Sequence, residues 1–307
     1  MALSTTQIDN NRGSNSISLP VDLSQAVIAK AVEQSAIMQL AQQIALPGRG
    51  EAVPVITADA TAAWNTESTE KAVSNATYNL KTMKPYKLAV IEMFSDEFRR
   101  DIPALYDELE RRLPSAIAKK FDYTVVNGTT PGTGFDTLAS SPTQSIVASG
   151  GKNVYQQLCT AMETLASGGF GLDGFAIAAQ GRVALMSAVD EDKRPLFVPS
   201  IDGGMFQNIL GARVVNAPAI FKAGAASTTG VDAVPNVVGV AGDWSQARWG
   251  IVDGINIAFS DQATINDGTN QVNLFQRNMF ALRVESELGF ICTDDDAFVK
   301  LTTPYSA

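Results

Sequence analysis

An apolar side chain recurs at every fourth position over residues 105–125, and this pattern predicts a long amphipathic helix. The positions are Leu105, Leu109, Leu113, Ile117, Phe121 and Val125. Asp101 offers an N-cap and Gly128 a left-handed stop, so we expect the helix over about 101–127. A step of four overshoots the helical turn, so the apolar stripe winds around the axis, as suits a rod lying diagonally across a sheet. Pro114 lies in the interior and predicts a kink or a short break.

A long polar span separates two runs that resemble strands, 53–56 and 86–91. The span holds little apolar material, so it cannot form a core of its own. We therefore predict a projecting two-stranded loop over 48–90, whose partners lie elsewhere. The residues expected to contact a neighbouring subunit are Trp64, Glu67, Glu70, Lys71, Tyr78, Lys81 and Lys84.

The rest of the chain mixes helical and strand patterns without a regular alternation. Helices are predicted at 153–166 and 182–189, and strands at 175–179, 213–217, 237–241 and 250–259. A long, partly alternating strand around 280–284 is expected to be followed by a second at 290–293. These elements predict an α+β fold, in which helices and antiparallel strands are interleaved.

The first 25 residues are polar and show neither a helical nor a strand period. Two interpretations stay open, a disordered tail and an arm that becomes ordered only against another subunit. A helical turn or two is expected over 23–44, before the chain break at Pro47 and Gly48.

Composition narrows the possible functions. The 307-residue chain carries a formal charge of −9 and contains no histidine. The charge argues against a protein that reads nucleic-acid sequence, and the lack of histidine removes the commonest general base and zinc ligand. Neither a signal peptide nor a membrane span is predicted, so we expect the chain to stay in the cytoplasm where it is made. Cys159 and Cys292 are expected to be reduced, buried thiols.

Short motifs that can carry chemistry are incomplete. The glycines at 168–171 lack the Lys and Ser/Thr of a phosphate-binding loop, and Asp294, Asp295 and Asp296 lack the spacing of a calcium loop. We therefore predict no catalytic, cofactor-binding or metal-binding residues, and a protein that is not an enzyme.

Several segments, taken in order, resemble the major capsid proteins of tailed bacteriophages, which have the Hong Kong 97-type (HK97-like) fold. They are WNTE at 64–67, KLAVIEMFSDEFRRD at 87–101, NGT at 127–129, GDWS at 242–245, RVE at 283–285 and AFVKL at 297–301. The last two resemble the closing strands of the family's peripheral domain. Each motif is weak alone, but their order and spacing agree over nearly the whole chain.

The resemblance implies a division into domains. It places an N-terminal arm at 1–47, the extended loop at 48–90, and an axial domain at 151–244. The peripheral domain, with the long spine helix, would comprise 91–150 and 245–307.

The resemblance also implies a function. Pentamers and hexamers would form an icosahedral shell around double-stranded DNA, as part of a virion assembled in the bacterial cytoplasm. A separate scaffolding protein, a portal protein and a decoration protein are the implied partners, and no membrane is involved. Lys71, Lys81 and Lys84 lie in the loop that some members crosslink covalently, but no acceptor asparagine can be identified. The alternative is the shell subunit of an encapsulin-type nanocompartment, which has the same fold and loads protein cargo.

Overall fold

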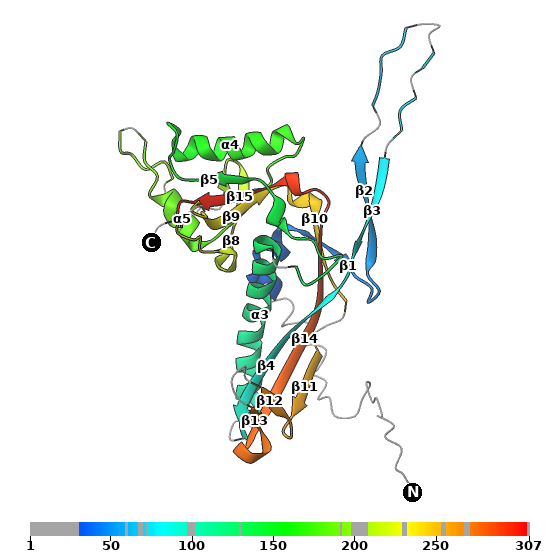
Figure 1. Ribbon diagram of the computed structural model, residues 1–307, viewed down its shortest axis with the longest axis vertical. Coiled ribbons are helices and arrows are strands. Elements are labelled where there is room, and N and C mark those ends of the chain that lie inside the picture. The colour runs from blue at the N-terminus through cyan, green and yellow to red at the C-terminus, as the bar shows by residue number, and fades with distance from the viewer. Residues whose placement is uncertain are drawn as a thin grey trace.

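The computed structural model describes residues 31–305 apart from 59–60, 67–69, 72, 76, 97–101, 129, 191, 198–207, 229–231, 253–255 and 267–270. In parts of some helices and strands, including most of the first half of the long helix, only the backbone is described. Three parts are visible in Figure 1: a rod made by one helix beside a sheet, a block of sheet and helices at one end of the rod, and a projecting hairpin.

The rod is α3 (Ile102–Asn127), as the apolar period predicts. It ends at Gly128, whose φ of +80° and whose close approach to Ala139 both require glycine. Of the kink or short break predicted at Pro114, the break is wrong, because α3 continues through this residue. Burial of the turns that follow Pro114 offsets the loss of one backbone hydrogen bond. The expected cap, Asp101, lies outside the described residues.

The sheet beside α3 is built around one long strand, β14 (Met279–Cys292). β4 (Tyr86–Ser95) pairs with β14 over ten residues, from Met279 to Leu288. β10 (Ala247–Ile251) and β11 (Asn256–Ser260) follow one another along β14, and β1 (Gln42–Ala45) pairs with β10.

The structure corrects two strand predictions in this sheet. The strands expected at 280–284 and 290–293 are one strand, β14. Its polar residues Glu285 and Glu287 interrupt the apolar pattern without ending the strand, because side chains on alternate faces of a sheet need not all be buried. Conversely, the single strand expected over 250–259 is the pair β10 and β11.

The block at the end of the rod is a six-stranded sheet. Its strands, in spatial order, are β5 (Thr143–Ser145), β15 (Phe298–Thr303), β9 (Asn236–Gly242), β6 (Gly174–Ile177), β8 (Ala212–Asn216) and β7 (Asn208–Ile209). β15 therefore pairs with β5 and β9 rather than with the sheet of β14, where the resemblance placed the strand at 297–301.

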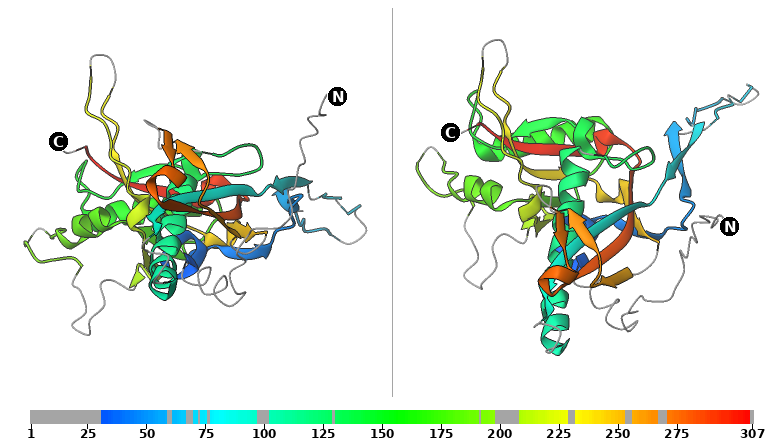
Figure 2. Two further views of the ribbon diagram at one scale, coloured as in Figure 1. Left: turned by 90° about the horizontal axis from the view of Figure 1, so that it is seen from below. Right: turned by 60° about the horizontal axis from the view of Figure 1, so that its bottom comes forward.

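Side chains of this sheet pack into two cores on its opposite faces. Phe175 and Ile177 of β6 pack with α4 (Val154–Ser167) and α5 (Ala179–Met186). Ala176, between them, belongs to the core that contains α3 and β14. The sheet thus separates the two helices from the rod, an arrangement visible from two directions in Figure 2.

The α+β class is confirmed, but the strands are less uniformly antiparallel than predicted. β6 with β8, β5 with β15, and β1 with β10 are parallel pairs. The helix predicted at 153–166 is α4, and Asn153 and Gln156 form a reciprocal capping box at its start. The segment expected to form a helical turn contains α2 (Ala36–Leu40) and then the strand β1.

Candidate intersubunit surfaces

The projecting hairpin consists of β2 (Glu51–Ala58) and β3 (Thr77–Met83), which pair with each other in a sheet of their own. The two strands expected at 53–56 and 86–91 are both present, but the strand at 53–56 pairs with β3, which was not predicted. The run at 86–91 is part of β4, which pairs with β14. The polar sequence of β3 gave no strand signal, because Asn79, Leu80 and Thr82 are exposed and, among its described side chains, only Met83 at the base of the hairpin enters a core.

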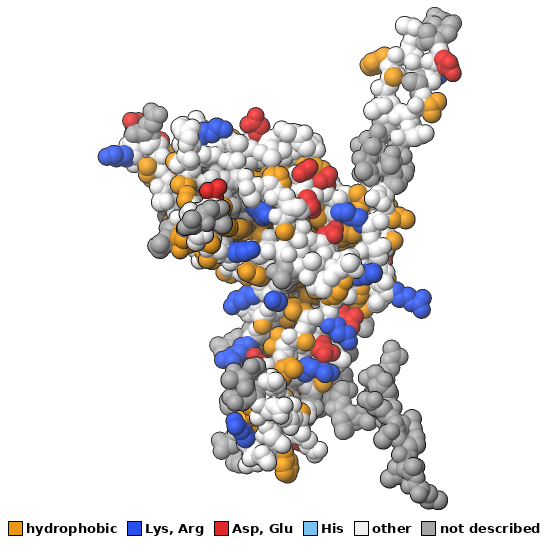
Figure 3. Space-filling model, in the orientation of Figure 1, with side chains coloured by type: hydrophobic (Ala, Val, Ile, Leu, Met, Phe, Trp, Pro, Cys, Tyr) orange, Lys and Arg blue, Asp and Glu red, His pale blue; other side chains and the backbone are white. Residues whose placement is uncertain are grey.

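The loop beyond the hairpin presents apolar side chains that have no core to enter. Trp64 is fully exposed and Val73 is 89 % exposed, and both lie between the ends of β2 and β3. Thr61 donates its backbone N–H to the Ser74 hydroxyl across the loop, at 2.7 Å. In Figure 3 hydrophobic side chains stand on this loop apart from the body of the molecule. These two side chains therefore contribute nothing to a core of the described chain.

The structure separates the residues predicted to contact neighbours into two places. Glu70 and Lys71 are exposed in the loop with Trp64, whereas Lys81 and Lys84 lie at the base of the hairpin. Glu67 lies outside the described residues, as does the side chain of Tyr78, whose backbone pairs with Ile56.

Lys81 fastens the base of the hairpin to its own subunit. Its Nζ donates to the Cys292 carbonyl oxygen at 2.8 Å and lies 3.4 Å from a carboxylate oxygen of Asp136. The same carboxylate oxygen accepts the Cys292 backbone N–H at 3.2 Å. The Lys84 backbone N–H donates to the Gly134 carbonyl at 2.7 Å. These bonds set the direction in which the hairpin leaves the body.

The second half of the predicted spine stripe faces the main core. Ile117, Phe121 and Val125 are buried with Leu282 and Phe290 of β14. The side chains of Leu105, Leu109 and Leu113 lie outside the described part of α3.

A buried carboxylate joins the N-terminal segment to α3. Asp122 accepts the Ser35 hydroxyl at 2.5 Å and the Ala36 backbone N–H at 3.0 Å. Burial raises the pKa of the Asp122 carboxyl from 3.8 to about 6, although these hydrogen bonds lower it. The sequence analysis missed Asp122, since a single acidic residue in a charged helix is typical of a solvent-exposed face.

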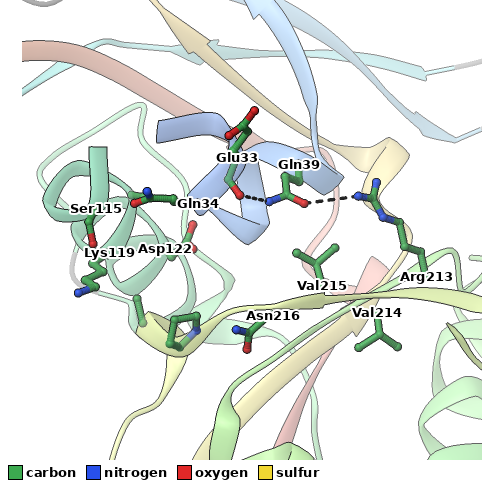
Figure 4. A pocket seen from close by; sticks show the side chains of 13 residues that line it. Glu33, Gln34, Gln39, Ser115, Lys119, Asp122, Arg213, Val214, Val215 and Asn216 are labelled. Carbon is green, nitrogen blue, oxygen red and sulfur yellow. Dashed lines mark hydrogen bonds between the residues drawn. The ribbon is translucent and has the colours of Figure 1, made fainter. Parts of the chain in front are cut away.

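A cavity of about 450 Å³ opens beside this carboxylate, between the N-terminal segment, α3 and β8. Figure 4 shows Glu33, Lys119 and Arg213 around it, so its walls carry charges of both signs. Arg213 donates to the Gln39 side-chain oxygen at 3.4 Å. Because positive and negative side chains both line the cavity, its charge favours neither an anionic nor a cationic ligand.

A smaller cavity, which we call the aromatic pocket, lies between α3, the start of β4 and the loop after α3. It measures about 260 Å³ and is lined by Tyr86, Phe121, Phe135 and Leu288, with Lys87 and Lys120 at its margin. The Tyr86 and Phe135 rings meet edge to face with centroids 6.2 Å apart, and the Tyr86 hydroxyl donates to the Thr133 carbonyl at 2.7 Å. The aromatic wall is therefore fixed before any partner arrives.

The described residues offer little for catalysis. Among them there is no group of three Cys, Asp or Glu side chains that could hold a metal ion. Burial raises the pKa of the Cys292 thiol to about 12, so it is not a thiolate nucleophile at neutral pH. In this described part of the chain, no helix combines the length and apolar character needed to cross a membrane.

A long helix beside a sheet, a second sheet covered by helices and a projecting hairpin together define an HK97-like capsid fold. The model of the phage capsid family matches residues 16–303, and the chain belongs to this family. It is a family of structural proteins rather than of enzymes.

Known proteins agree with this assignment. The chain is 33 % identical over 298 residues to the "Probable major capsid protein gp17" of Mycobacterium phage L5, with 92 % of this chain and 89 % of that protein covered. A solved structure from Gordonia phage Cozz has a TM-score of 0.68 at 23 % identity, covering 89 % of this chain and 87 % of that chain. The structure titled "Capsid of empty GTA particle computed with C5 symmetry" has a TM-score of 0.63 at 13 % identity, with 95 % and 94 % covered. These matches give the nanocompartment alternative no support.

Proposed function

We propose that this chain is the major capsid protein of a tailed phage, and that its copies assemble as pentamers and hexamers into an icosahedral shell around double-stranded DNA. The observation that carries the proposal beyond family membership is the projecting loop. A fully exposed tryptophan on a hairpin that pairs with no other strand of the described chain is a liability for a monomer. In a shell the same loop becomes contact area that is repeated by symmetry.

The division into arm, extended loop, peripheral domain and axial domain is part of this proposal, with β5 and β15 moved to the axial domain because they belong to its sheet. It is supported by the hairpin, by the packing of α3 against β14, and by the separate six-stranded sheet. The partners that follow are a separate scaffolding protein, a portal protein and a decoration protein, and assembly would take place in the host cytoplasm. The formal charge of −9 suits a shell that confines DNA without adhering to it.

Electron microscopy of the expressed protein tests the proposal. The chain is produced alone and also together with the products of its neighbouring genes, and each preparation is sedimented at near-physiological salt. We expect closed polyhedral particles or tubes in at least one preparation. Monodisperse monomers in both would contradict a shell-forming function.

A further inference from the structure

The aromatic pocket and the exposed Trp64 are two unpartnered features of complementary chemistry on one chain. We propose that Trp64 of one subunit inserts into the aromatic pocket of a neighbouring copy. This inference rests on the proposed shell function and names the contact that joins one subunit to the next.

The size and walls of the pocket suit an indole ring. Its volume of about 260 Å³ is below the range of about 300–1,000 Å³ typical of small-molecule sites, and so favours a single large side chain over a cofactor. Tyr86 and Phe135 line the space and meet each other edge to face, and a further aromatic ring prefers such edge-to-face or offset contacts. Tryptophan is among the residues enriched as anchors in the central pockets of interfaces.

The walls are held in place by the main core rather than by flexible loops. The Phe135 ring packs edge to face against Phe121, with ring centroids 6.4 Å apart, and its centroid lies 6.3 Å from that of Phe290 of β14. The Tyr86 ring packs directly against Gly132, where an added Cβ would clash with it at 2.5 Å from the hydroxyl oxygen. A rigid pocket loses little conformational entropy when an anchor enters.

Charge supports the same occupant. Lys120 is exposed at the margin of the pocket, and Lys87 lies there 3.5 Å from Glu287. On the loop, the sequence after Trp64 contains Glu67 and Glu70 within six residues. An apolar anchor followed by acidic residues matches an apolar pocket bordered by lysines.

The contact must form between subunits. The hairpin directs its loop away from α3 and from the start of β4, as Figures 1 and 2 both show, so Trp64 cannot reach the pocket of its own chain. A contact in which the loop of each subunit enters the pocket of the next is heterologous, and such contacts form rings when the rotation between subunits closes. Rings are the form that pentamers and hexamers require.

Site-specific photocrosslinking tests the contact directly. The full-length protein carries p-benzoylphenylalanine in place of Trp64, is assembled, sedimented and irradiated, and the crosslinked peptides are identified by mass spectrometry. We expect crosslinks between copies, from position 64 to residues 86–88, 120–124 or 130–135. The same photoreactive residue in place of Val73, also exposed on the loop, serves as the control and should give a different pattern.

Substitutions provide a second measurement. We expect Trp64→Ala to raise the protein concentration needed for assembly by at least about tenfold, because it removes an interface anchor. Lys120→Glu should also raise the protein concentration needed for assembly. Lys119→Glu is its matched control, since this adjacent exposed lysine borders the other cavity and should have the smaller effect. Circular dichroism of each unassembled variant shows whether the subunit is folded.

The outcomes separate this inference from the proposed function. Assembled particles whose position 64 crosslinks elsewhere, or not between copies, would overturn the docking contact and leave the shell function standing. Equal effects of Lys120→Glu and Lys119→Glu would also count against the pocket. The absence of particles from the unmodified chain, with or without its neighbouring gene products, would overturn both.

Discussion

The carboxylate of Asp122 connects two parts of the chain that are 86 residues apart. Its two oxygens accept the Ser35 hydroxyl and the Ala36 backbone N–H at the start of α2, at a place that solvent does not reach. Hydrogen bonds to a charged group stabilise it, but complete burial of the charge opposes ionisation. The raised pKa shows that burial is the larger effect.

Asp122 makes stability depend on pH in a definite direction. Its pKa in the folded protein is about 6, against 3.8 as the ordinary value, so over this interval the folded state keeps a proton that the unfolded chain has released. The stabilisation is therefore fully present below pH 3.8 and is lost as the pH rises through 6. A shift of about two pKa units corresponds to about 3 kcal/mol. The charged and titratable groups near the adjoining cavity are Glu33, Lys119 and Arg213.

Chemical denaturation between pH 4 and pH 7 measures this contribution. We expect the free energy of unfolding of the wild type, relative to Asp122→Asn, to fall by about 2–3 kcal/mol over that range. A flat difference would mean that the Asp122 carboxyl titrates alike in both states.

Gly128 shows a second residue-scale constraint, at the end of α3. Its φ is +80°, and an added Cβ would lie 2.5 Å from the Ala139 Cβ. Gly151 has a similar φ of +78° but open space around the same position. We therefore expect Gly128→Ala to destabilise by about 1–3 kcal/mol more than Gly151→Ala, as measured by urea denaturation. Equal losses would show that backbone strain alone matters.

At the scale of elements, the contact between α3 and β14 carries much of the main core. Phe121 packs edge to face against Phe290 with ring centroids 6.3 Å apart. Removing this ring leaves a cavity that rigid neighbours cannot fill, so Phe121→Ala should lower the free energy of unfolding by about 3–5 kcal/mol. Lys120→Ala, on the exposed face of the same helix, should change it by less than about 0.5 kcal/mol. Thermal or urea denaturation of both variants checks the difference.

The elements that the sequence predicted correctly are those whose burial follows a regular period. The apolar step of four indicates α3, and the helix expected at 153–166 is α4. β3 escaped prediction because most of its described side chains are exposed and show no apolar alternation. The pairing of β15 with β5 and β9 also escaped, since it joins segments distant in sequence and depends on the tertiary fold.

The residues of the candidate surfaces were also only partly predictable from the sequence. Trp64 stood out as a bulky side chain in a polar span, and its full exposure agrees with a role outside the subunit. Lys81 looked equivalent to Lys71, but it bonds to Cys292 and Asp136 of its own chain. The aromatic pocket had no sequence signal at all. It draws side chains from α3, β4 and β14, and their meeting follows only from the complete fold.

At the scale of the whole molecule, the formal charge of −9 bears on the contact with DNA. Protein–DNA affinity comes largely from cations that neutralise phosphates, and it falls steeply with added salt. We expect empty particles and unassembled subunits not to retard linear double-stranded DNA in gels at physiological ionic strength. Retardation that weakens as salt is added would reveal a basic surface that the net charge conceals.

The position of β15 has a consequence for synthesis. This strand comes after all the other described strands in the chain, yet it lies between β5 and β9 inside the six-stranded sheet. A ribosome must therefore deliver residues 298–303 before that sheet can close, although α4 and β6 have been available for more than a hundred residues of translation. Until residues 298–303 have been synthesised, the edge of β9 that receives β15 stays unpaired, so the six-stranded sheet is among the last parts of the described chain to close.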